Sequence, residues 1–163
     1  MIAGASKVIR ALGGGTVGAI ALTALHEVTR RTVPHAPRMD VIGMRALSKT
    51  VRALGRRPAR GSRLFRQTLV GDLAANALYY SLAGGGSRSA RRGLLLGAVA
   101  GLGAAALPQL LGLGRSPGAR WPATPLMTLT LYTAGGLAAG AVASMLGPDD
   151  APPGGDQRRA LAG

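Results

Sequence analysis

The segment Gly71-Asp72-Leu73-Ala74-Ala75-Asn76-Ala77-Leu78-Tyr79-Tyr80-Ser81 carries a carboxylate, an amide and two phenols within a largely apolar stretch. On a helix, Asp72, Asn76 and either tyrosine lie at i, i+4 and i+7 or i+8, so they share one face. If this helix crosses a membrane, an ionisable side chain is costly in lipid and needs protein partners. The pattern therefore predicts a helix that packs into a bundle by its polar face.

Four apolar blocks, separated by arginine-rich connections, account for most of the 163 residues. The 26 glycines favour close packing of membrane helices, and the lack of cysteine excludes disulfides and thiolate metal sites. The predicted fold class is an all-α integral membrane protein with one helical bundle over residues 1–147. Its elements are four transmembrane helices (about 6–33, 64–84, 93–114 and 126–147) and one basic amphipathic interfacial helix (about 40–54). Residues 148–163 are expected to form a disordered polar tail.

The segment 40–54 has apolar residues at helical spacing on one side and cations on another. Asp40 is placed to cap the N-terminus of this helix. A basic amphipathic helix between two membrane spans is expected to lie in the interface, with its cations on lipid phosphates. The alternative is a binding surface for an acidic partner. The expected lipid head-group contacts are Arg45, Lys49, Arg52, Arg56 and Arg57.

The formal net charge of +14 invites a nucleic-acid interpretation. A nucleic-acid-binding domain gathers its basic residues on one face, often with stacking aromatic residues. Here the basic residues flank and connect apolar blocks, which is the arrangement of membrane proteins. Nucleic acid is therefore rejected as a partner, and the anionic head groups of membrane lipids are expected instead.

The distribution of lysine and arginine also predicts an orientation. With four spans, 13 of the 20 basic residues lie on the side of the 34–63 connection and seven on the other side. The positive-inside bias then places this connection in the cytoplasm and both termini outside. Frequent alanine, glycine and arginine are typical of bacteria with GC-rich genomes. The expected location is the inner (cytoplasmic) membrane of a bacterium, as a multi-pass protein.

Four antiparallel spans would bring polar side chains from every span to a similar depth. One interpretation is structural, because polar side chains often bond membrane helices to one another. In a second, the residues line a cavity that binds a head group, an ion or a small solute. In a third, they form a catalytic site. The candidate binding residues of this intramembrane cluster are His26, Glu27, Asp72, Asn76, Tyr79, Tyr80, Gln109, Thr128 and Tyr132.

No motif in the chain identifies an enzyme or a cofactor. HExxH and GxSxG are absent, and His26-Glu27 with a distant Asp72 matches no zinc signature. We therefore expect no metal, no cofactor and no catalytic residues. The expected function is that of a small non-catalytic membrane protein, acting as an accessory or assembly subunit or as a lipid-interacting organiser.

The main alternative is a small transporter or channel with a polar cavity around Asp72, and a third is a membrane-embedded enzyme that uses His26, Glu27 and Asp72. Pairs of glycines four residues apart mark close helix contacts, either within the bundle or between copies of the chain. The expected protein partners are accordingly a second copy of the chain or the other subunits of a membrane complex.

Overall fold

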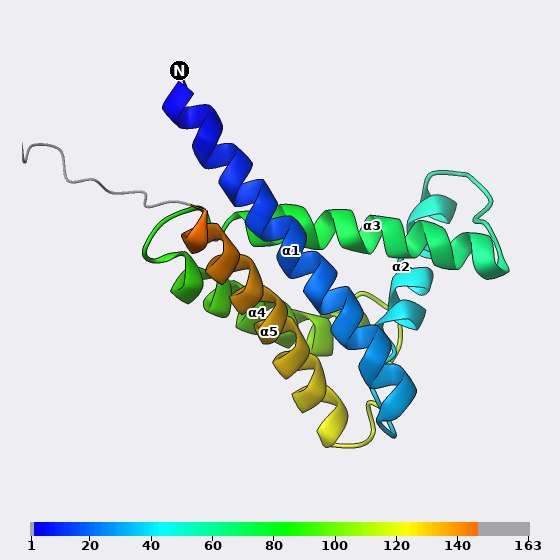
Figure 1. Cartoon of the computed structure of the whole chain (residues 1–163). Coiled ribbons are helices and arrows are strands. Elements are labelled where there is room, and N and C mark those ends of the chain that lie inside the picture. The colour runs from blue at the N-terminus through cyan, green and yellow to red at the C-terminus, as the bar shows by residue number, and fades with distance from the viewer. Residues whose placement is uncertain (1, 147–163) are drawn as a thin grey trace, which may run out of the picture.

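The computed structural model of the chain describes residues 2–146 and contains five α-helices (Figure 1). The helices are α1 (Ile2–Thr32), α2 (Met39–Ala53), α3 (Gly61–Ser81), α4 (Ser89–Leu110) and α5 (Ala123–Met145). No strand occurs between residues 2 and 146. The prediction of an all-helical chain is thereby confirmed. The predicted disordered tail lies outside the described residues.

Three of these helices are long and apolar enough to cross a membrane, namely α1 (over Ser6–Thr32), α4 and α5. They correspond to three of the four predicted spans. The fourth predicted span corresponds to α3, which does not meet the same criterion because Arg63, Arg66 and Asp72 interrupt its apolar residues. Residues 2–146 are therefore all-helical with three helices suited to a membrane, and length and composition do not establish a fourth crossing.

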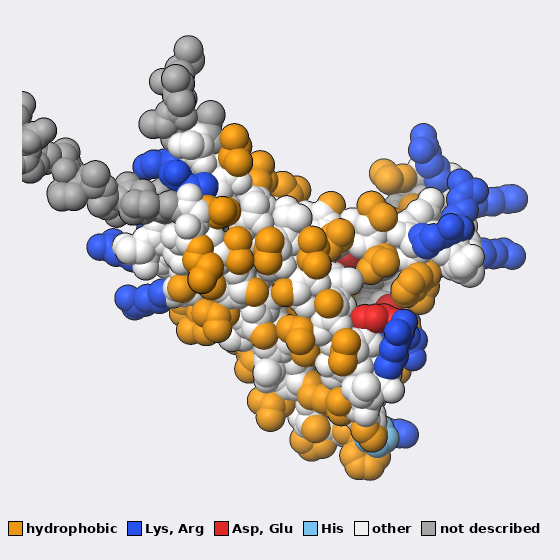
Figure 2. All heavy atoms as spheres, viewed as in Figure 1, with side chains coloured by type: hydrophobic (Ala, Val, Ile, Leu, Met, Phe, Trp, Pro, Cys, Tyr) orange, Lys and Arg blue, Asp and Glu red, His pale blue; other side chains and the backbone are white. Residues whose placement is uncertain are grey.

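The outer surface of these three helices is apolar, as a lipid environment requires. Figure 2 shows apolar side chains spread over the middle of the molecule, with most of the basic ones gathered toward its edges. Large apolar side chains in contact with solvent would be unfavourable in water, whereas hydrocarbon accommodates them. The exposed apolar residues include Val8, Ile20 and Val28 of α1, Leu95, Val99 and Leu102 of α4, and Leu126 and Leu137 of α5.

The helices pack in the order α4–α5–α1–α3, and α2 contacts α3. In Figure 1, α1, α4 and α5 run in similar oblique directions, whereas α3 crosses α1 and carries α2 beside its N-terminal half. The α3 helix therefore diverges in direction from α1, α4 and α5. This crossing creates a wedge between α1, α2 and α3.

Glycines allow α4 and α5 to touch through their backbones. A Cβ atom added to Gly97 would lie 2.5 Å from the carbonyl oxygen of Tyr132, and one added to Gly136 would lie 2.8 Å from the nitrogen of Gly97. Gly14 of α1 approaches α5 in the same way, with its added Cβ 2.7 Å from the carbonyl oxygen of Ala139. The glycine faces of α4 and α5 thus meet inside the chain, so they are not free for contact with another copy.

Two tyrosines of the polar stripe tie α3 to its neighbours. The hydroxyl of Tyr80, whose side chain is fully buried, donates to the carbonyl oxygen of Tyr132 at 2.8 Å. The hydroxyl of Tyr79 donates to the carbonyl oxygen of Leu96 at 3.0 Å. Such bonds across helices fix their register. The side chains of Tyr80, Leu22, Leu131 and Tyr132, with Ala139, form the buried core.

The start of α2 differs from the prediction that Asp40 caps it. The helix begins at Met39, the capping position is Arg38, and no side chain makes a capping bond there. The Asp40 carboxylate instead accepts two bonds from the Arg38 guanidinium, at 2.9 and 2.8 Å. The prediction was wrong because this arginine, two residues earlier, gives the carboxylate a charged partner that is stronger than a backbone N–H.

We predict that Gly136→Ala destabilises the fold, because its methyl group would overlap the backbone of α4. Overpacking of this kind costs about 1–3 kcal/mol. The matched control is Gly71→Ala on α3, where an added Cβ has no atom within 4 Å. Thermal unfolding in mild detergent checks the pair: Gly136→Ala should unfold several degrees lower, and Gly71→Ala should unfold no lower than the parent. Equal unfolding temperatures for both variants would contradict the packing described above.

Candidate functional site

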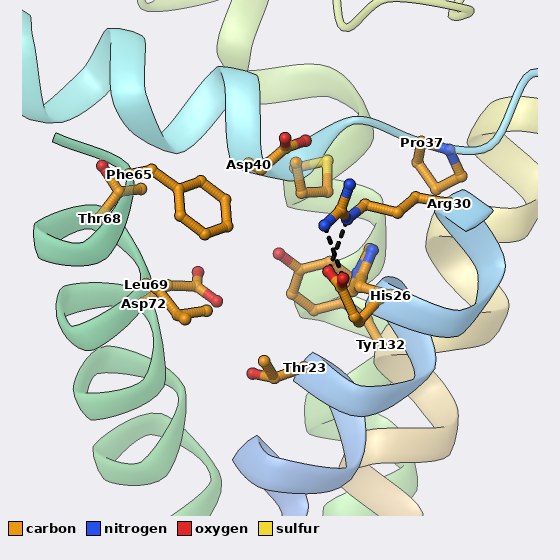
Figure 3. A pocket seen from close by; sticks show the side chains of 12 residues that line it. Thr23, His26, Arg30, Pro37, Asp40, Phe65, Thr68, Leu69, Asp72 and Tyr132 are labelled. Carbon is orange, nitrogen blue, oxygen red and sulfur yellow. Dashed lines mark hydrogen bonds and ion pairs between the residues drawn. The ribbon is translucent and has the colours of Figure 1, made fainter. Parts of the chain in front are cut away.

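A cavity of about 70 Å³ lies in the wedge between α1, α2 and α3, with α5 as its floor (Figure 3). A buried water needs about 10–15 Å³ on this kind of measure, so the space suits a few waters or one small solute. The lining residues are Thr23, His26, Glu27 and Arg30 of α1, Pro37, Met39 and Asp40 at the start of α2, Phe65, Thr68, Leu69 and Asp72 of α3, and Tyr132 of α5.

All three acidic residues of the described part of the chain line this cavity, and two of them are neutralised. Glu27 accepts two bonds from the Arg30 guanidinium, both 2.6 Å, and also pairs with Arg31. Asp40 is paired with Arg38, and this guanidinium holds the pKa of the Asp40 carboxyl below its usual value because it stabilises the charged form.

Asp72 differs from the other two carboxylates, since it forms no ion pair with any described residue. Figure 3 shows its side chain pointing from α3 toward α1. The Asn76 side chain donates to the backbone carbonyl of Asp72 at 2.9 Å. Asp72 is therefore the one carboxyl group in the cavity that no cation of the described residues pairs.

Several buried polar atoms around the cavity lack a hydrogen-bond partner among the described residues. They are both ring nitrogens of His26 and the hydroxyl oxygens of Thr23 and Thr68. A neutral imidazole presents one donor and one acceptor, and a hydroxyl can do both. Leaving such a group unpaired costs about 1–3 kcal/mol. The residues that line the cavity thus include unsatisfied polar groups in addition to the Asp72 carboxyl.

The apolar part of the lining includes aromatic rings. Phe65 reaches in from α3 and Tyr132 from α5 (Figure 3). The His26 ring meets the Tyr132 ring edge-on, with centroids 5.5 Å apart. Ring faces attract cations, and apolar walls favour a guest with carbon atoms. Charge, hydrogen-bonding groups and rings therefore converge on one small space.

The predicted polar cluster divides in the structure. His26, Glu27, Asp72 and Tyr132 share the cavity, whereas Tyr79 and Tyr80 join helices and Asn76 bonds to its own helix. The remaining two residues line a second, smaller hollow between α4 and α5. There Gln109 accepts a bond from Arg115 at 3.2 Å, and the Thr128 hydroxyl donates to the carbonyl oxygen of Thr124 at 3.0 Å.

Sequence reasoning missed part of the cavity, including Thr23, Asp40, Phe65 and Thr68. One signal was available. Glu27, Asp40 and Asp72 are the only acidic residues before position 149 in a chain with 20 basic ones, and their rarity marks them. The two threonines carry no comparable signal, because hydroxyls are common in membrane helices and usually bond to their own backbone.

The basic residues expected on lipid phosphates also divide. The Arg45 guanidinium donates to the carbonyl oxygens of Leu113 and Arg115, at 3.1 and 3.0 Å, and Lys49 donates to that of Leu111 at 2.6 Å. These two cations bind the segment that follows α4. Arg52, Arg56 and Arg57 are exposed and form no hydrogen bond or ion pair with described residues.

Within residues 2–146, no group of three or more histidine, aspartate or glutamate side chains could hold a metal ion. Comparison of the chain with protein-family models, with curated proteins and with solved structures gave no match. The chemistry of the cavity is therefore the basis for a functional conclusion.

We predict that Arg45→Ala and Lys49→Ala each lower the thermal stability of the detergent-solubilised protein. Each removes charge-assisted bonds to backbone carbonyls, which for exposed groups corresponds to about 1 kcal/mol, or roughly 2–4 °C in a chain of this size. Arg52→Ala is the matched control on the same helix, since Arg52 makes no such bond. If all three variants unfold at the same temperature as the parent, the attachment of α2 to the end of α4 is not a stabilising contact.

Proposed function

We propose that the protein is a non-catalytic integral membrane protein that binds a small organic cation in the cavity around Asp72. The observation that carries this proposal is the Asp72 carboxylate, which forms no ion pair with a described residue, in a cavity whose His26 nitrogens lack protein partners. A charged group near the hydrocarbon region is costly unless an opposite charge accompanies it. A bound ammonium group would neutralise Asp72 and donate hydrogen bonds to it.

The rest of the lining favours an organic cation over a metal ion. Metal sites need several convergent ligands, and two of the three carboxylates here already hold arginines. Phe65, Leu69 and Tyr132 supply an apolar wall and ring faces, which suit the carbon atoms next to an ammonium group. The volume of about 70 Å³ limits the guest to a few non-hydrogen atoms.

An enzymatic role for the same residues is less well supported. His26, Glu27 and Asp72 do line one cavity, as a catalytic set would require. However, Arg30 bonds to both carboxylate oxygens of Glu27, and Arg31 adds a further pair. A carboxylate held by two guanidinium groups is a weak base. Glu27 is therefore better suited to shaping the cavity than to accepting a proton.

The proposal includes a membrane topology. Bonds such as Lys49 to Leu111 and Thr124 to His35 hold the ends of α1 and α4 and the start of α5 at one end of the molecule, together with α2. Because α3 starts near α2 and leads to the start of α4, it returns the chain to the opposite end. This supports α3 as a fourth, tilted crossing. We place the α2 end in the cytoplasm and the protein in a bacterial inner membrane.

A transporter would bind its small cation at this polar cavity around Asp72, and an accessory subunit could bind the same ligand there. Binding there requires no catalysis. The accessory, assembling or lipid-organising role expected from the sequence stays a prediction, which the cavity neither requires nor opposes.

The test is calorimetric titration of ethylammonium chloride into the full chain in nanodiscs, against sodium chloride at equal ionic strength. We expect ethylammonium to bind and Asp72→Asn to weaken its binding at least about tenfold, since a hydrogen bond to a charged group is worth about 1.5–3 kcal/mol. Tyr79→Phe, on the same helix but outside the cavity, should bind like the parent. Binding that survives Asp72→Asn, or no binding to the parent, would refute the proposal.

A further inference from the structure

Six arginines gather on the hairpin formed by α2 and α3. They are Arg52, Arg56, Arg57, Arg60, Arg63 and Arg66, and we refer to them and the segment that carries them, residues 52–66, as the basic arm. All six are exposed, and none forms a hydrogen bond or ion pair with a described residue. No acidic residue occurs between Asp40 and Asp72, so nearby carboxylates do not offset this charge. Figure 2 shows a large basic group at this edge of the molecule.

The basic arm has a defined shape. Helix α2 packs closely on α3, since a Cβ atom added to Gly43 would lie 2.6 Å from the Cγ2 atom of Thr68. The turn between the helices uses Gly55 and Gly61 at positive φ angles of 72° and 54°, which other residues adopt less readily. Near the first of these glycines, Leu54 is 71% exposed. The tip therefore combines an apolar side chain with flanking cations.

The position of the basic arm relative to the apolar helices points to its partner. Arg45 and Lys49 attach α2 to the backbone that follows α4, at the end of a membrane-length helix. The arm is thereby held at the level where apolar helices end, which in a bilayer is the level of the head groups. An apolar residue flanked by cations at that depth is typical of a segment that binds the interface. A nucleic acid or an acidic protein would have to reach the same layer.

We propose that the basic arm is a docking surface for the anionic phospholipid head groups of the membrane that holds the helices, with Leu54 inserted among the acyl chains. The six arginines bind phosphates, and the attraction weakens at high salt because mobile ions screen it. Of the cations expected on lipid from the sequence, Arg45 and Lys49 serve attachment to the fold, whereas Arg60, Arg63 and Arg66 of the next segment join the lipid-binding set. This surface is independent of the cavity around Asp72.

The test uses the absence of cysteine from the chain, because Leu54→Cys gives a single labelling site at the tip of the arm. The full-length protein carries an environment-sensitive fluorophore there, in nanodiscs of phosphatidylcholine alone or with about one third phosphatidylglycerol. We expect the anionic lipid to shift the emission to the blue and to lower quenching by neutral acrylamide at least twofold. Half-molar salt should reverse part of this change.

The triple variant R56Q/R57Q/R60Q, made in the labelled protein, should lose the response to phosphatidylglycerol. The matched control is R88Q/R91Q/R92Q, which removes three exposed arginines just before and within the first turn of α4, and it should keep the response. Thermal unfolding of both variants at the parent's temperature would show that exposed arginines were changed without loss of the fold. A parent that responds equally to both lipid mixtures, or an R56Q/R57Q/R60Q variant that still responds, overturns the proposal. Protection of the label by polyglutamate in neutral nanodiscs, without any effect of phosphatidylglycerol, overturns it in favour of an acidic protein partner.

Discussion

The backbone contact between α4 and α5 is the constraint on which the rest of the structure depends. At Gly97 and Gly136 the two helices approach so closely that even a methyl group would overlap the opposite backbone. Lipid supplies no hydrophobic force to bring helices together, so contact area and close approach must hold the pair. Helix α1 then packs on α5 through Gly14 and Gly18, and three helices form a compact unit.

The position of α3 follows from what that unit leaves available. The face of α5 that carries glycine is already covered by α4 and α1, so α3 packs mainly on α1 and reaches α5 through the hydroxyl of Tyr80. Because α3 crosses α1, the two helices diverge, and the start of α2 closes the space between them. The cavity is thus a consequence of helix geometry, and the polar side chains of His26 and Asp72 lie where that geometry opens.

Much of the fold could be predicted from the sequence, because length and hydropathy determine which segments become apolar helices. The helix α3 was predicted as well, but length and hydropathy do not assign it to the membrane, since Arg63, Arg66 and Asp72 reduce its apolar character. In the site, the similar depth expected for polar residues in antiparallel spans selected His26 and Asp72, but it could not show that Asp40 would join them. The position of Asp40 depends on Arg45 and Lys49, which attach α2 to backbone carbonyls more than 60 residues away. No local sequence pattern encodes such bonds.

The central claim is that a small ammonium ion binds at the Asp72 carboxylate. The most direct measurement is solid-state NMR of the full chain in lipid, with the aspartate side chains labelled with ¹³C and ethylammonium labelled with ¹⁵N. A dipolar contact between the ammonium nitrogen and a carboxylate carbon, assigned to Asp72 because it disappears in Asp72→Asn, is the predicted result. A spectrum without that contact at saturating ethylammonium, or a contact that persists in Asp72→Asn, would contradict the account.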